Sequence, residues 1–256
     1  MPEPLPLSLV VITRDAAAEL AACLASAPFA AEALVVDSGS ADHTVDVARA
    51  AGARVLVEPW RGFGPQKRFA VEQAAHDWVL CLDADERVSP PLAEAIRALF
   101  ERGAPAAPAY AIARRNRFLG RWLAHGEGYP DWTVRLFDRH RAQWSDDAVH
   151  ERVVSERPAT RLRGDLLHAS AESLDDYLAK QNRYTSIQAA ALHARGVRSS
   201  AAQLVLSPFV RFLRFYVLRL GFLDGMAGFA HIAIGAFASF QKHVKLRALD
   251  VTERQA

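Results

Sequence analysis

The sequence predicts an α/β fold, in which a mostly parallel sheet carries helices on both faces and a helical region follows at the C-terminal end. Short apolar, β-branched runs alternate with helical segments over residues 1–105. Acidic residues directly follow two of these runs, and after about residue 170 only helical periodicity is left. Continuous apolar strands joined by helices are typical of a parallel sheet that is covered on both faces.

The N-terminal alternation defines four strands and four helices. The expected strands are Leu7–Thr13, Ala33–Asp37, Ala53–Val57 and Trp78–Leu82. The expected helices are Ala16–Ala27, Asp42–Ala51, Gln66–Ala75 and one that begins after Ser89. Ser89 precedes two prolines, and a serine N-cap followed by proline in the first turn is a typical helix start.

The pattern changes twice further along the chain. Shorter and more polar strands are expected at Tyr110–Arg117, Thr133–Asp138, Val149–Val154 and Arg161–His168. Helices are expected at Leu174–Ala194, Leu204–Phe222 and Met226–Leu246, with a hinge at Gly196–Ser200. We therefore expect one domain over residues 1–170, divided into halves 1–105 and 106–170, and a helical region over residues 171–256.

Composition and charge exclude several classes of protein. Hydrophobic residues make up 51% and charged residues 23%, which excludes wholesale disorder. The net charge of +2 argues against a general nucleic-acid binder. Residues 1–171 carry a net charge of −3 and residues 172–256 a net charge of +5, which indicates that the C-terminal region meets an anionic surface. Two cysteines in apolar segments and a start without a basic signal region predict a cytoplasmic protein.

Carboxylates follow two of the expected strands. Asp37 ends the second strand, and Asp83 and Asp85 follow the fourth. Because ligands bind at the carboxyl ends of parallel strands, these side chains would converge on one crevice. Oxygen ligands one residue apart suit Mg²⁺ or Mn²⁺ held together with a diphosphate, whereas the alternative is that such residues cap turns and helices, most of all Asp42 or Ser40. The sequence has no GxGxxG, P-loop, GxSxG or zinc-binding pattern, so those chemistries are not expected.

These segments together resemble a known family. The runs VVDSGSAD, GFGPQKRFAVEQA and DWVLCLDADE resemble the family 2 glycosyltransferases, which have the Rossmann-like GT-A fold. The later runs DWTVRLFDR, AVHERV, LLHAS and YLAKQNRYTS resemble one subgroup, the lipopolysaccharide core β-1,4-glucosyltransferases. The resemblance covers nearly the whole chain. It implies an inverting, metal-dependent transfer of a hexose, expected to be glucose, from a UDP-sugar to a heptose of the inner core.

The resemblance also implies roles for residues of the first half. Asp37 matches the acid that recognises the nucleotide, although Ser38 stands where the family often has a second acid. Thr13 matches a position that lines the nucleotide, and Lys67 one that lies near the donor diphosphate. Asp85 matches the metal-binding acid, with Asp83 supporting the ribose or the metal. The resemblance therefore places the expected metal and part of the donor site at the Asp83-Ala84-Asp85 run.

The acceptor half is expected to supply the catalytic base, because inversion by direct displacement needs a carboxylate that takes the proton of the attacking hydroxyl. Candidates are Asp146, Asp147 and Glu151, of which the resemblance favours Glu151, with Asp147 as the second choice. His168, which closes the last expected strand, matches a histidine that completes the metal site. A structural role for this histidine is the alternative.

The C-terminal region predicts contact with a membrane. In Leu204–Phe222 the only charges are Arg211, Arg214 and Arg219, which share an arc of about 140° on a helix whose remaining surface is mostly apolar. Such a helix suits the surface of the inner membrane, where a lipid-linked saccharide acceptor would be presented. Packing of these helices in a homodimer is the alternative. At the level of function, the alternatives are transfer to another cell-envelope glycan or to a protein, a sugar nucleotidyltransferase, and a non-catalytic membrane-docking protein.

Overall fold

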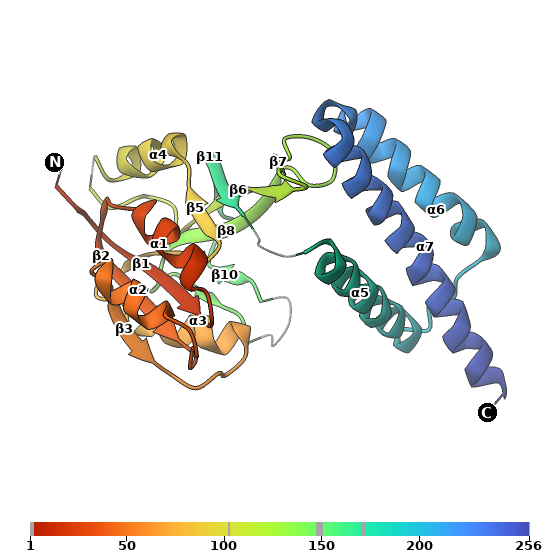
Figure 1. Ribbon diagram of the computed structural model, residues 1–256, viewed down its shortest axis with the longest axis horizontal. Coiled ribbons are helices and arrows are strands. Elements are labelled where there is room, and N and C mark those ends of the chain that lie inside the picture. The colour runs from red at the N-terminus through yellow and green to blue at the C-terminus, as the bar shows by residue number, and fades with distance from the viewer. Residues whose placement is uncertain (1–2, 102, 147–150, 170–172, 256) are drawn as a thin grey trace. The chain divides into compact units, whose positions relative to one another are not determined.

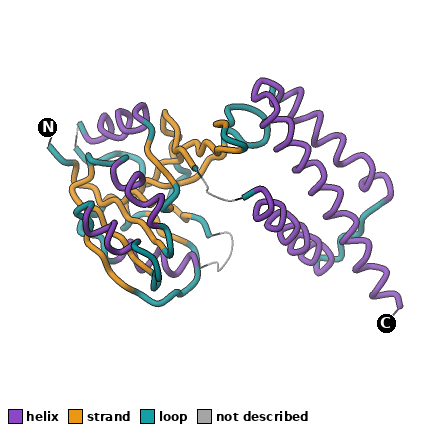
Figure 2. Tube along the Cα trace, in the orientation of Figure 1, coloured by secondary structure: helices purple, strands orange, loops and turns teal. Residues whose placement is uncertain are grey.

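The computed structural model describes residues 3–101, 103–146, 151–169 and 173–255, and it divides into two units (Figures 1 and 2). Unit 1 consists of Met1–Arg115 and Asp131–Ala169, and unit 2 of Asn116–Pro130 and Ser170–Ala256. The division differs from the expected boundary in one respect. Residues 116–130 lie within the first 170 residues of the chain, yet they pack with the C-terminal helices.

Unit 1 is built on one large sheet with the strand order β3-β2-β1-β4-β8-β6-β11-β5. The first four strands of this order are parallel and match the four that the sequence predicts. Their bounds are Arg54–Val57 (β3), Ala30–Asp37 (β2), Leu5–Thr13 (β1) and Trp78–Asp83 (β4). The expected α/β fold class, with a mostly parallel N-terminal sheet and a helical C-terminal region, is confirmed.

The remaining strands extend the sheet in antiparallel fashion. β8 pairs with both β4 and β6, and β11 pairs with β5. Their bounds are Glu86–Val88 (β5), Ala109–Phe118 (β6), Asp131–Asp138 (β8) and Thr160–His168 (β11). A separate hairpin-like pair is formed by Ala142–Trp144 (β9) and Val153–Ser155 (β10). The short β5 was not expected, because three residues between a turn and a helix leave no period to detect.

Helices cover both faces of the parallel strands, and the core therefore has two layers. The strand residues alternate: Leu9 and Val11 face one layer, while Val10 faces the other. The first layer is closed by helices α1 (Ala17–Ala25), α2 (Thr44–Ala50) and α4 (Pro90–Phe100), and the second by α3 (Phe63–Glu72) together with β9. Ser89 caps α4 through its side chain, as expected, with Leu92 N donating to the hydroxyl at 3.4 Å.

Helix α3 begins three residues earlier than expected. In the sequence, the Gly64-Pro65 pair indicates that no helix includes these residues. However, proline is compatible with the first turn of a helix, because the N–H groups of that turn have no hydrogen-bond partner within the helix. The helix starts after Gly62, whose φ of +97° suits glycine. As a result, Lys67 lies one turn inside the helix and is buried, rather than on an exposed first turn.

Unit 2 contains three long helices, of which α7 contacts the other two (Figure 1). They are α5 (Leu174–Ala194), α6 (Ala201–Leu213) and α7 (Gly225–Gln255). The expected single helix over Leu204–Phe222 is interrupted: α6 passes into a π-helical turn, η1 (Arg214–Leu218), and a 3-10 turn, η2 (Gly221–Asp224). The helical path breaks at Leu220, whose φ is +56°, and the next residue must be glycine, because a Cβ on Gly221 would lie 2.2 Å from Ile232 Cδ1 and 2.7 Å from Phe215 O.

Residues 116–130 are tied to this helical unit by hydrogen bonds. The buried carboxylate of Asp224 accepts the backbone N–H groups of Ala124 at 2.9 Å and His125 at 2.8 Å. Gly126 N donates to Arg219 O at 2.9 Å, and Glu127 pairs with Arg211. The two-residue strand β7 (Arg121–Trp122) folds back on the end of β6 within this segment. The segment therefore forms an integral part of unit 2 in space although α5 starts more than 40 residues later in the chain.

Candidate active site

The carboxyl ends of the parallel strands bring three of the predicted residues to one edge of the sheet. Thr13 ends β1 and lies in register with Asp37, which ends β2. On the other side of β1, Ile12 is in register with Asp83, which ends β4. Because neighbouring strands are about 4.8 Å apart, Asp37 and Asp83 stand on either side of Thr13 with roughly 10 Å between their backbones.

Asp37 and Thr13 form the buried end of this edge. The Asp37 carboxylate accepts the N–H groups of Gly39 and Ser40, both at 2.9 Å, and is 1% exposed. These bonds fix the turn after β2 and hold the carboxylate in one orientation. The Thr13 hydroxyl is buried, and no hydrogen-bond partner for it lies among the described residues. An orphaned buried hydroxyl at a strand end is what a site for a polar ligand requires.

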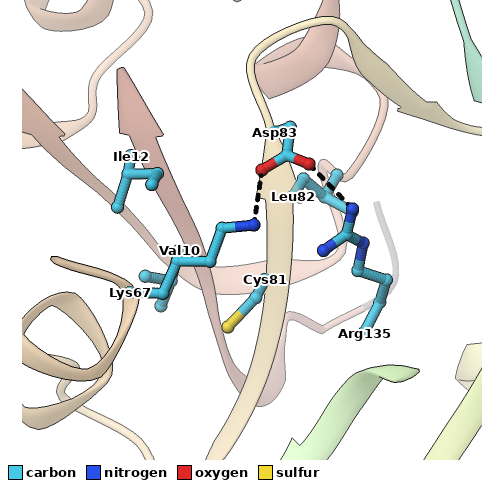
Figure 3. A pocket seen from close by; sticks show the side chains of 7 residues that line it. All are labelled: Val10, Ile12, Lys67, Cys81, Leu82, Asp83 and Arg135. Carbon is cyan, nitrogen blue, oxygen red and sulfur yellow. Dashed lines mark hydrogen bonds and ion pairs between the residues drawn. The ribbon is translucent and has the colours of Figure 1, made fainter. Parts of the chain in front are cut away.

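Asp83 lies between two buried cations (Figure 3). Its Oδ1 is 3.0 Å from Lys67 Nζ, and its Oδ2 accepts a hydrogen bond from Arg135 at 2.8 Å. Burial alone would raise the pKa of the Asp83 carboxyl, but Arg135 and Lys67 outweigh this and hold the pKa well below its usual range. The cavity beneath the three groups has a volume of about 10 Å³, enough for one water molecule. The cavity is therefore too small to hold a larger ligand among these side chains.

Sequence reasoning missed the two residues that anchor the Asp83 turn. Glu86, fully buried on β5, accepts the Asp83 backbone N–H at 3.0 Å and an Arg135 N–H at 2.7 Å. Arg114 adds a second cation 3.7 Å from the Glu86 carboxylate. One sequence signal could have found Arg135, since it is a charged residue in the middle of the apolar strand β8. Its partners could not be found in this way, because they lie about 50 residues away on other strands.

Lys67 connects the Asp83 cluster to the predicted base. Its ammonium donates to Glu151 Oε1 at 2.9 Å, so one nitrogen links the end of β4 with the segment before β10. The indole of Trp144 packs over the same ammonium, with the ring centroid 4.7 Å from Nζ. Asp146, the third candidate base, is 74% exposed in its side chain and pairs with Arg68 instead. Asp147, the second choice, lies outside the described residues.

Asp85 and His168, the predicted metal ligands, lie beside one another. β5 pairs with β11 so that His168 is opposite Glu86, and the Asp85 Oδ2 to His168 Nε2 distance is 3.1 Å. Neighbouring ligands of an octahedral ion with bonds of about 2.1 Å are about 3 Å apart, so the separation fits one Mg²⁺ or Mn²⁺ ion. Both side chains are partly exposed, so an ion between them could be reached from solvent. The carboxylate and imidazole therefore suit a divalent cation.

Comparison with known proteins places the chain among glycosyltransferases. The model of the family described as Glycosyl transferase family 2 matches residues 8–203. A lipopolysaccharide core biosynthesis glycosyltransferase, LpsC, from Rhizobium meliloti is 31% identical over 249 residues, covering 94% of this chain and 92% of the relative. An uncharacterized glycosyltransferase from Rickettsia typhi is 31% identical over 259 residues, covering 97% and 89%.

Solved structures give weaker matches. Mannosyl-3-phosphoglycerate synthase from Rubrobacter xylanophilus is 19% identical with a TM-score of 0.46, covering 74% of each chain. Glucosyl-3-phosphoglycerate synthase from Mycobacterium tuberculosis, in complex with Mn²⁺, UDP and glucosyl-3-phosphoglycerate, is 22% identical with a TM-score of 0.36, covering 43% of this chain and 44% of that one.

Proposed function

Because the chain belongs to glycosyl transferase family 2 and is therefore a glycosyltransferase, we propose that it transfers glucose from UDP-glucose to a heptose of the lipopolysaccharide inner core, with inversion. The acceptor class is supported by the relative from Rhizobium meliloti, which matches over most of both chains. Family membership also sets aside the sugar nucleotidyltransferase that the sheet alone would allow. The observation that carries the proposal is the bridge from Asp83 through Lys67 to Glu151 at the carboxyl edge of the sheet.

The edge of the sheet provides the donor site. Thr13 and Asp37 bind the nucleoside, since one offers an unpartnered hydroxyl and the other a fixed carboxylate. Asp85 and His168 hold the divalent ion, Mg²⁺ or Mn²⁺. When bound, this ion stabilises negative charge on the leaving diphosphate. Lys67 and Asp83 stand at the floor of the site, where the ammonium adds positive charge beside the diphosphate.

Glu151 acts as the base. As the acceptor oxygen forms its bond to C1 of the sugar, the bond from C1 to the diphosphate oxygen breaks and the hydroxyl proton passes to the Glu151 carboxylate. The hydrogen bond from Lys67 holds that carboxylate in one orientation before the acceptor arrives. Eighteen per cent of the Glu151 side chain is exposed, so its second oxygen can reach an acceptor.

The acceptor places the enzyme at the cytoplasmic face of the inner membrane. A lipid-linked saccharide does not leave the bilayer, so the enzyme must come to it. The net charge of +5 on residues 172–256 supports peripheral association with anionic lipid. This proposal gives the helical unit a purpose beyond packing or dimer formation.

The metal site and the donor are tested together by calorimetric titration with UDP, in the presence and absence of Mn²⁺. We expect metal-dependent UDP binding by the wild type, and loss of the metal dependence and of transfer in Asp85→Ala with the fold intact by circular dichroism. Asp46→Ala, an exposed acid on α2, is the matched control. Normal turnover in the presence of EDTA would contradict the metal requirement, and turnover of GDP- or dTDP-sugars in preference to UDP-sugars would contradict the donor.

A further inference from the structure

One side of α6 and η1 carries large apolar side chains that the described residues of unit 2 leave exposed. The opposite side packs on α7, where Phe212 and Tyr216 lie 5.9 and 5.8 Å from the Phe229 ring centroid. Ser207 contacts Ser239 on the same side at 3.1 Å. The outward side, which we call the outward face, has side chains that are between 47% and 79% exposed. Its residues are Leu206, Phe209, Val210, Leu213, Val217 and Leu218.

The exposed charges next to the outward face in the sequence are positive. From residue 201 to residue 249 the chain has six Lys or Arg side chains and one acid, Asp224, which is 2% exposed and engaged by residues 124 and 125. Arg214 and Arg219 are exposed beside the apolar residues. The sequence predicts that Arg211, Arg214 and Arg219 form one exposed stripe. The prediction is wrong for Arg211, which turns inward and pairs with Glu127.

The same helices do not suit a transmembrane arrangement. By length and composition, Ala201–Leu218 and Gly221–Glu253 are each apolar enough to cross a bilayer. However, the turn between them is closed by residues 116–130: Gly126 donates to Arg219 O, and the Asp224 carboxylate binds two backbone N–H groups. A helical hairpin that crossed a bilayer would carry this polar segment and its charges into the hydrocarbon, which is costly.

We propose that the outward face is a docking surface for an anionic phospholipid bilayer, with α6 lying parallel to the membrane. Phe209 and Leu213 enter the boundary between headgroups and acyl chains, while Arg214 and Arg219 contact the headgroup phosphates. Charge selects this occupant over a second copy of the chain, since two such faces would repel one another. The inference rests on the proposed function for its purpose, because a lipid-linked acceptor requires an enzyme at the bilayer.

The buried native cysteines allow a direct test in the full-length protein. Cys23 and Cys81 are buried, and burial raises the pKa of the Cys81 thiol to about 12, so neither competes for labelling under native conditions. An environment-sensitive fluorophore on Val210→Cys should shift to the blue with phosphatidylcholine vesicles that contain phosphatidylglycerol. The same label on Ile187→Cys, an exposed α5 position, should not shift.

Glutamate substitutions measure how much the outward face contributes to vesicle binding. Phe209→Glu with Leu213→Glu should weaken flotation with the phosphatidylglycerol vesicles on the order of tenfold or more, whereas Leu178→Glu with Ile187→Glu on α5 should not. Unchanged flotation of the first variant, equal binding to vesicles of phosphatidylcholine alone, or a change from dimer to monomer in light scattering would each overturn the proposal.

Failure of the proposed function gives a different result. Both double variants should bind UDP as the wild type does and should transfer glucose normally to a water-soluble, delipidated core oligosaccharide. If vesicle docking behaves as proposed but no oligosaccharide acceptor is used, the function is wrong and the docking surface stands. If the oligosaccharide acceptor is used but the outward face does not bind vesicles, the docking proposal is wrong and the proposed function stands.

Discussion

The ammonium of Lys67 lies in contact with Asp83 and Glu151, and this arrangement sets how single substitutions in the site should behave. Lys67 is 6% exposed, so bulk water does not readily take the place of a partner that a substitution removes. Substitutions that keep the shape of a side chain but remove its charge are therefore the informative ones. They separate loss of chemistry from loss of structure.

Glu151→Gln should lower kcat on the order of 100-fold or more, with little change in the KM for the donor, because the amide keeps the Lys67 contact but cannot take a proton. Steady-state kinetics with varied donor and saturating acceptor measures this. Asp146→Asn, at an exposed position, is the control. If Asp147→Asn lowers kcat in this way while Glu151→Gln does not, the base has been assigned to the wrong residue.

Arg135→Met should destabilise the protein by about 3–5 kcal/mol, since it removes the cation that donates to the buried Glu86 carboxylate and leaves only the more distant contact with Arg114. Adding Glu86→Gln to the variant should recover part of this loss, because no uncompensated buried charge remains. Urea unfolding followed by fluorescence measures both variants. Additive losses of stability in the double variant would contradict the coupling of the two residues.

The site could be predicted from sequence only in part. Strand-end carboxylates such as Asp37 and Asp83 were found because a parallel sheet brings the ends of its strands together whatever the details of packing. Glu86 and Arg135 were missed because a buried ion pair between residues 49 apart leaves no local pattern. The burial of Lys67 was missed for a related reason: it depends on a helix start, and a glycine and a proline concealed that start.

At the scale of elements, close packing between β11 and α4 makes one glycine indispensable. Gly164 has a φ of +96°, and a Cβ there would lie 2.4 Å from the backbone N of Leu92. Gly164→Ala should therefore lower the free energy of unfolding by about 2 kcal/mol or more. Gly196→Ala, at a φ of +71° with no atom within 4 Å of the added carbon, should cost only about 1 kcal/mol. Equal losses in urea unfolding would show that backbone strain and not the contact is decisive.

His231 on α7 should make unit 2 sensitive to acid. The ring contacts Phe118 and Tyr177, and no hydrogen-bond partner of its buried Nδ1 lies within the described part of the chain. Burial lowers the pKa of His231, with Arg211 acting in the same direction and Glu127 and Asp224 opposing it. The unfolded chain therefore binds a proton more readily than the folded one, and stability should fall as the pH drops below about 6.5.

The measurement is the change in Tm between neutral pH and a pH of about 5.5. This change should be smaller in His231→Gln than in the wild type, because glutamine does not titrate. A wild-type-like change in His231→Gln would show that other groups cause the acid sensitivity.

The predictable part of the fold consists of the elements in which apolar residues recur at the spacing of a strand or a helix. The parallel strands and their helices were expected within a few residues, because their apolar runs are bounded by polar turns. The π-helical and 3-10 turns inside the expected helix Leu204–Phe222 were not, since Phe215 and Phe222 continue the apolar pattern through them. The close approach at Gly221, which requires glycine there, involves Ile232 on another helix.

At the scale of the whole molecule, unit 2 is built from two separate stretches of the chain, residues 116–130 and 170–256. This predicts what happens when the second stretch is removed. Removing residues 170–256 takes away Arg211 and Asp224, and with them the partners of Glu127, Ala124 and His125. Limited proteolysis of this truncated chain should cut first within residues 116–130, which stay protected in the full-length protein. First cleavage inside the parallel strands would contradict this expectation, and the uncut full-length chain is the reference.

The bonds between Asp224 and residues 124 and 125 also concern the growing polypeptide on the ribosome. The acceptor of these two N–H groups is synthesised about 100 residues after the donors. At a synthesis rate of roughly 5–20 residues per second, the N–H groups of residues 124 and 125 lack the Asp224 acceptor for about 5–20 seconds. During that interval the nascent chain must keep an incomplete polar segment in water, and a chaperone that binds it there would have a defined window in which to act.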